Sequence, residues 1–134
     1  MPFTAHNPRP FFDAIAARLV ASTGRTIGRS EAPAVVTVPY AVVYPLDEDD
    51  TDTTLDDPFD VTLFRWSVVS VGDSEEQALW MVHKVRVALV GWQPVVAGLT
   101  CGFVFRDGGR GVSREDPTQP PKFSGADVFT VFAD

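Results

Sequence analysis

Two stretches of the chain place apolar residues at the spacing of an α-helix. The first runs over Pro8–Thr23, where Asn7 can cap the amino end and Gly24 suits the carboxyl end. Pro8 suits the first helical position because its missing N–H needs no partner there. The second begins at the capping-box sequence Ser74–Gln77 and continues to about Val90. Its apolar residues form one broad arc of the helical wheel, which we expect to face the core: Ala78, Met81, Val82, Val85, Ala88 and Leu89.

Other stretches are β-branched and aromatic, which favours extended structure. Pro39 separates the first two of them and cannot donate to a strand ladder, so this strand is expected to bend or to lie at a sheet edge. Both faces of the long stretch Val61–Val71 carry apolar residues, which predicts a strand covered on two sides. The predicted strands are Ala34–Val38, Tyr40–Tyr44, Val61–Val71, Gly102–Arg106 and Val128–Phe132.

This order of elements fits an α+β fold, with a mostly antiparallel sheet on which two main helices pack. The length predicts a single domain over residues 1–134. We expect a long acidic loop at about residues 46–60, which lack periodicity. A second, irregular loop is expected at about residues 107–126, which open on the turn sequence Asp107-Gly108-Gly109 and contain three prolines.

Charge is distributed unevenly along the chain. The formal net charge is −7, from 18 acidic and 11 basic residues. Eight of the acids lie between Asp47 and Asp60, and without them the remaining charge is +1. This balance argues against a nucleic-acid binder and against an anionic membrane as partner, because both need a basic surface. The eight acids are Asp47, Glu48, Asp49, Asp50, Asp52, Asp56, Asp57 and Asp60.

No set of residues has the spacing of a catalytic or metal site. His6 and His83 lie far apart, without ligand-spaced partners, and Cys101 lies in an apolar stretch that favours a buried, inert thiol. The run Gly108–Gly111 is explained by turn chemistry, because no helix follows it as a phosphate loop requires. The acidic segment lacks the glycine and glutamate of a calcium loop, which leaves at most weak cation binding. We therefore expect no catalytic residue, cofactor or resident metal.

Trp80 and Val87 lie together on the side of the second helix opposite its core arc, between Glu76 and Lys84. Solvated helix faces seldom carry a tryptophan, so two interpretations stay open. Either a neighbouring strand or loop of the same chain covers the pair, or Trp80, Val87, Lys84 and Glu76 form a subunit interface, where aromatic residues are enriched.

Several segments resemble the tail terminator proteins of long-tailed, siphovirus-type phages that infect actinobacteria. These segments are PYAVVYPL (Pro39–Leu46), WSVVSVG (Trp66–Gly72), the helical stretch Glu76–Leu89, GGRGV (Gly108–Val112), Asp116, QPPKF (Gln119–Phe123) and the strand Asp127–Phe132. Together they cover nearly the whole chain. The variable loop, often rich in Gly and Pro in that family, is rich in Asp here.

The resemblance implies a virion structural protein without catalysis, cofactor or membrane. It implies a hexameric ring at the head-proximal end of the tail, assembled in the host cytoplasm. Such a ring caps the tail tube, ends tail polymerisation and joins the tail to the head–neck complex. Its expected partners are further copies of itself, the major tail protein and a head-completion or neck protein, and DNA passes through without tight binding. The acidic loop then lines the lumen or lies on a ring face.

Three alternatives remain open at this stage. A head-closure or neck connector protein of the same phage also forms rings. A prophage-derived contractile or transfer particle would keep the mechanism and change the host context. A small ligand-binding or enzymatic α+β domain would need a pocket with converging polar groups, and the sequence shows no such set.

Overall fold

The computed structural model describes residues 8–34, 37–46, 49–50 and 62–133. It contains two 15-residue helices and a mostly antiparallel sheet, so the predicted α+β fold is confirmed. The elements along the chain are α1 (Arg9–Thr23), β1 (Ile27–Arg29), β2 (Tyr40–Pro45), β3 (Asp49–Asp50), β4 (Thr62–Gly72), α2 (Glu75–Leu89), β5 (Val95–Val96), β6 (Leu99–Thr100), β7 (Phe105–Arg114) and β8 (Phe123–Ala133).

The main sheet has the strand order β1-β2-β4-β8-β7, and β3 pairs with one end of β4. Only β1 and β2 run parallel, while the other pairs of this sheet are antiparallel. The 11-residue strands β4 and β8 pair over their whole length and form the centre of the sheet. β5 and β6 form a separate small hairpin. The outer strands are therefore β1 at one edge and β7 at the other.

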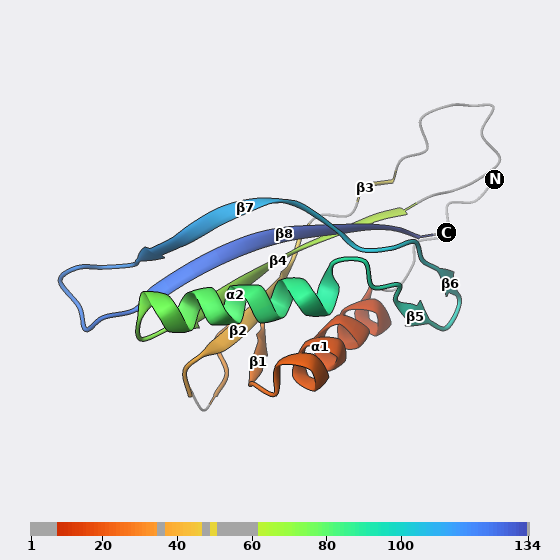
Figure 1. The fold of residues 1–134 in the computed structure, drawn as a ribbon. Helices are drawn as coiled ribbons and strands as arrows, with labels where there is room; N and C mark the ends of the chain where they lie inside the picture. The colour runs from red at the N-terminus through yellow and green to blue at the C-terminus, as the bar shows by residue number, and fades with distance from the viewer. Residues whose placement is uncertain (1–7, 35–36, 47–48, 51–61, 134) are drawn as a thin grey trace.

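Both helices pack on the same face of the sheet (Figure 1). Alternate residues of β4, namely Phe64, Trp66 and Val68, are fully or almost fully buried under them. Phe11 of α1 stacks on Phe64 with their ring centroids 4.4 Å apart. The helix-covered face of the sheet therefore holds the main core.

The opposite face of β4 is only partly covered, so the predicted cover on two sides is wrong for most of this strand. Leu63, Ser67 and Val69 are half-buried. Only at the far end does a small second cluster form, where Val71 is buried with Tyr40 and Val42. Pairs of hydrophobic residues across neighbouring strands, rather than a second helix layer, bury these side chains.

α2 follows the sequence-based expectation closely. All six residues of the predicted core arc are buried. The Ser74 hydroxyl caps the helix by accepting a hydrogen bond from the Gln77 backbone N–H at 3.2 Å. The Gln77 side chain accepts in turn from the Asp73 backbone N–H at 2.8 Å, one residue earlier than in the usual reciprocal box.

α1 differs from expectation only at its amino end. Pro8 occupies the N-cap position without a side-chain cap, and the predicted cap Asn7 lies outside the described residues. At the other end Gly24 has φ = 69°, the left-handed conformation that favours glycine after a helix.

The predicted strand Ala34–Val38 is wrong at its three described residues, and Val35 and Val36 lie outside the described part of the chain. Ala34, Thr37 and Val38 form no strand, and β2 is joined instead by β1, a short strand that lacked a sequence signal. The side chain of Arg25 explains the difference, because it donates hydrogen bonds to the carbonyl groups of residues that a strand would otherwise pair. These are the carbonyls of Thr37 at 3.3 Å, Val38 at 2.8 Å and Pro39 at 2.8 Å.

The predicted loop at residues 107–126 is also wrong over most of its length. Residues 107–114 belong to β7 and residues 123–126 belong to β8, which leaves an eight-residue connection that contains the three prolines. The expected turn Asp107-Gly108-Gly109 lies inside β7, at the first of two register shifts. A Cβ atom on Gly109 would lie 2.3 Å from the Ala126 carbonyl oxygen. The glycines thus permit a bulge in a continuous strand rather than ending it.

The acidic segment is described at two positions only. Asp49 and Asp50 form β3 and pair with Leu63 and Thr62 of β4, so the prediction of a loop is wrong for these two residues. The other six acids of the segment lie outside the described residues, namely Asp47, Glu48, Asp52, Asp56, Asp57 and Asp60.

We expect Phe11→Ala to lower the free energy of unfolding by about 3–5 kcal/mol, because it removes a fully buried ring from the α1–sheet interface. Urea unfolding followed by tryptophan fluorescence measures the change. Val20→Ala, on the half-exposed side of the same helix, is the control and should change stability by less than about 0.5 kcal/mol. Equal losses in the two variants would contradict the assignment of the core.

Candidate assembly surfaces

The outward side of α2 carries large apolar side chains in contact with solvent. Trp80 is 42% exposed and Val87 is 64% exposed. Leu79 and Val90 lie on the same side and are about half exposed. These four residues, with Glu76 and Lys84, are here called the α2 stripe. The exposed fractions exclude the alternative in which a described strand or loop of the same chain covers Trp80 and Val87.

Trp80 contacts a cation and lines one side of a groove. The ammonium group of Lys84, one helical turn along, lies 5.5 Å from the centroid of the Trp80 ring, at the spacing of a cation–π contact. The groove beside the ring has a volume of about 320 Å³ and reaches to Arg25 and Pro39, with Glu76 on its wall. The four interface residues predicted from the sequence therefore lie together on one helix face.

Leu79 and Val90 were missed in the sequence analysis. The sequence does indicate their position, because on a helical wheel both residues lie within about 100° of Val87 and outside the core arc. Together the four apolar residues make the outward side of α2 more hydrophobic than a solvated helix needs.

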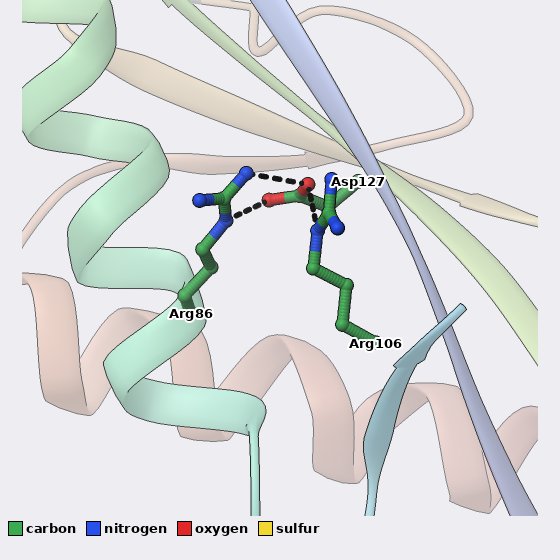
Figure 2. Close-up of polar contacts among 3 residues, drawn as sticks. All are labelled: Arg86, Arg106 and Asp127. Carbon is green, nitrogen blue, oxygen red and sulfur yellow. Dashed lines mark hydrogen bonds and ion pairs between the residues drawn. The ribbon is translucent and has the colours of Figure 1, made fainter. Parts of the chain in front are cut away.

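A second feature beside α2 is a cluster of three charged residues that the sequence did not reveal (Figure 2). Arg86 of α2 donates two hydrogen bonds to Asp127 of β8, one from Nε to Oδ2 at 2.8 Å and one from Nη2 to Oδ1 at 3.0 Å. Arg106 of β7 donates from Nε to Oδ1 of the same carboxylate at 2.7 Å. One buried carboxylate thus ties the helix to the two strands at this edge of the sheet.

Burial by itself would raise the pKa of Asp127, whose side chain is almost fully buried. The hydrogen bonds from Arg86 and Arg106, together with their positive charges, outweigh this effect and lower the pKa of Asp127 below its ordinary value. The bond to Asp127 raises the pKa of Arg86, so that guanidinium stays charged. The cluster carries a net charge of +1, and both arginine side chains remain partly exposed.

The face of the sheet away from the helices has a smaller apolar patch near one end. Phe105 of β7 and Phe132 of β8 are 40% and 47% exposed, with ring centroids 6.2 Å apart. Beside them Asp107 accepts a hydrogen bond from the Thr130 hydroxyl and pairs with Arg65. The described chain therefore exposes apolar side chains on two opposite sides.

The residues considered for chemistry are not brought together. His83 is exposed on α2, and Cys101 is buried within the main core. In residues 8–34, 37–46, 49–50 and 62–133, no three His, Cys, Asp or Glu side chains are grouped so as to hold a metal ion. Neither helix of that part of the chain is long and apolar enough to cross a membrane.

Comparisons with known proteins reveal a similar fold but no similar sequence. No protein-family model matches the sequence, and no curated protein matches it. Among solved structures, the chain resembles a protein chain in the virion of a native gene transfer agent particle, with a TM-score of 0.72 and 16% sequence identity. The match covers 97% of this chain and 98% of that chain, so the two share a fold over their whole lengths.

The Asp127 cluster makes stability depend on pH. Because folding lowers the pKa of Asp127, its stabilisation is present above the unfolded-state value of about 3.9 and is lost as the pH falls through the lowered folded value. We expect Asp127→Asn to cost about 1–3 kcal/mol at neutral pH and to flatten the loss of stability below about pH 4. Urea unfolding at a series of pH values measures both. If Asp127→Asn loses stability below about pH 4 as steeply as the unmodified chain, other carboxylates cause that loss.

Proposed function

We propose that this chain is a structural protein of a phage or phage-like virion, which acts by binding other protein chains. The observation that carries the proposal is the α2 stripe, because the exposed Trp80, Leu79 and Val87 of the helix and the exposed Val90 at its C-cap suit a protein–protein interface. The fold shared with a protein of a gene transfer agent virion supports it. A virion part needs neither a metal nor a catalytic group.

Within this class we propose a tail terminator that forms a hexameric ring at the head-proximal end of the tail. Such a ring would cap the tail tube, end tail polymerisation and present a surface to the neck of the head. The resemblance of segments from Pro39–Leu46 to Asp127–Phe132 to tail terminator proteins supports this choice. The negative charge of the chain suits a channel through which DNA passes, since it repels phosphate.

Ring geometry also suits the surfaces of the subunit. Neighbours in a ring meet head to tail, so each copy needs two different contact surfaces. The α2 stripe would supply one of them. The second has to lie elsewhere on the subunit, and the far side of the sheet and the β7 edge are both open to a neighbour in the described chain.

We expect Trp80→Asp to lower the affinity between ring subunits by about tenfold or more, because it places a charge at the centre of the proposed contact. The melting temperature should change little, since the side chain is already 42% exposed. Light scattering after size exclusion measures assembly, and calorimetry measures folding. Val20→Asp, on the exposed side of α1, is the matched control and should leave assembly unchanged. A collapsed melting temperature with normal assembly of the folded fraction would show that Trp80 serves the core.

Deletion of the gene in the phage should yield over-long tails without heads, because tube protein would continue to add. Electron microscopy of the lysate measures tail length. Electron microscopy of the purified chain should show isolated rings. Tails of normal length that fail to join heads would indicate a head-closure or neck protein instead. Long tubes formed by the purified chain alone would indicate a tail-tube protein. A gene position just before that of the major tail protein would support the terminator.

A further inference from the structure

The small hairpin of β5 and β6 presents apolar side chains to solvent. It lies beyond the carboxyl end of α2 (Figure 1), in a 19-residue stretch, Val87–Phe105, that contains no charged residue. Because side chains alternate along a strand, Val96 enters the main core while Val95 is 92% exposed. Val95 is the most exposed large hydrophobic residue of the described chain, and Phe103, after β6, is 65% exposed.

The hairpin is anchored on the core at its base. The Gln93 side-chain amide donates to the Cys101 carbonyl at 2.9 Å. The backbone N–H of Val104 donates to the Trp92 carbonyl at 2.8 Å. An apolar side chain on such a preformed support loses little conformational freedom when a partner binds, so more of its burial contributes to affinity. Val95 therefore has the properties of an interface anchor.

The groove beside Trp80 offers apolar surface rather than free polar groups. Arg25, on its wall, already donates to three backbone carbonyls, and the Ser74 hydroxyl already accepts from the backbone of its own helix. Trp80 and Pro39 line the groove as well, with the exposed Glu76. Its volume of about 320 Å³ is at the lower end of the roughly 300–1,000 Å³ of ligand pockets. The groove thus suits apolar side chains of another protein chain.

The hairpin and the groove lie at opposite ends of α2. Ser74 caps the helix beside the groove, whereas Val95 follows five residues after the C-cap residue Val90. At about 1.5 Å per residue this 15-residue helix is about 22 Å long, and the hairpin is fixed to the core at the far end. The hairpin therefore cannot fill the groove of its own chain. Copies arranged head to tail bring the two surfaces together.

We propose that the β5–β6 hairpin of one copy binds the groove beside Trp80 of the next copy, with Val95 against the Trp80 ring and Pro39. The charges of the two surfaces are compatible. The hairpin brings no charged side chain, and the guanidinium of Arg25 keeps its own hydrogen bonds, so the contact buries no unpaired charge. This inference rests on the proposed ring, and it names the second of the two surfaces that a head-to-tail contact needs.

The exposed apolar area at this end of the subunit is sufficient for such a contact. Phe132 lies beside the hairpin, since its carbonyl accepts from the Gly102 backbone N–H, and it is 47% exposed next to Phe105. At about 200 Å² per phenylalanine, Phe103, Phe105 and Phe132 together expose about 300 Å². Val95 adds about 100 Å². A standard interface needs about 450 Å² of apolar surface on each partner.

We expect Val95→Asp to raise the concentration needed for ring formation by about tenfold or more, because it places a charge in an apolar groove. The melting temperature should change little, since Val95 is 92% exposed. Light scattering after size exclusion measures assembly, calorimetry measures folding, and Val20→Asp is again the control. Mixing Val95→Asp with Trp80→Asp combines one intact groove with one intact hairpin, so 1:1 pairs should appear that neither variant forms alone.

Cross-linking identifies which surfaces meet, because a disulfide joins only cysteines whose Cα atoms lie within about 7 Å. A chain with both Val95→Cys and Glu76→Cys should form covalent oligomers when oxidised glutathione is added to the rings. Each single substitution should give only monomer on a non-reducing gel, since the native Cys101 is buried. Covalent dimers from Val95→Cys alone would show that two hairpins face each other and would overturn the inference.

Normal ring yield from Val95→Asp would also overturn the inference, while leaving the ring itself in place. If those rings no longer bind purified tails, the tail rather than a second copy is the partner of the hairpin. If Val95→Asp melts at a lower temperature, Val95→Ser repeats the measurement with a smaller change. No ring or other oligomer from the unmodified chain would contradict the proposed function itself.

Discussion

The structure depends on one constraint, which is that both helices cover the same face of the sheet. Alternate residues of β4 and β8 meet α1 and α2 on that face and form a single aromatic and aliphatic layer, with Phe11, Phe64 and Trp66 in contact. In the part of the chain that the structure describes, no helix covers the other face, which stays partly buried, with Phe105 and Phe132 exposed. The chain therefore buries its main core between the helices and one face of the sheet, while apolar side chains stay exposed on the outward side of α2 and on the other face of the sheet.

Arginine side chains set the limits of the sheet. The Arg25 side chain donates hydrogen bonds to the backbone carbonyl groups of residues 37–39. These carbonyl groups are therefore not free to pair in a strand that would precede β2. Arg86 and Arg106 meet on Asp127 and hold α2, β7 and β8 together at the other edge. In both places a guanidinium with several donors satisfies groups from distant parts of the sequence, and this geometry suits Arg better than Lys.

The same arrangement separates the features suited to assembly. The α2 stripe lies on the helix side, the aromatic pair lies on the far side of the sheet, and the β5–β6 hairpin lies beyond the carboxyl end of α2 (Figure 1). Distinct surfaces on different sides of one subunit suit head-to-tail contacts, which form closed rings when the rotation between neighbours closes. Two identical patches facing each other would form a dimer instead.

The sequence by itself determined the elements with strong local signals. The capping residues and apolar arc of α2, and the position of Trp80 opposite that arc, follow from local sequence and periodicity, which need no knowledge of distant partners. The tertiary structure decided that Trp80 is exposed and that Phe64, Trp66 and Val68 lie on the covered face of β4. Only the tertiary structure decided where strands stop and which charges meet. Arg25 ended a stretch of good strand formers, the glycines of β7 bulged within a strand because β8 continued the ladder, and Arg86 met Asp127 across 41 residues. Such contacts join residues far apart in the chain, and local composition carries no record of their distance in space.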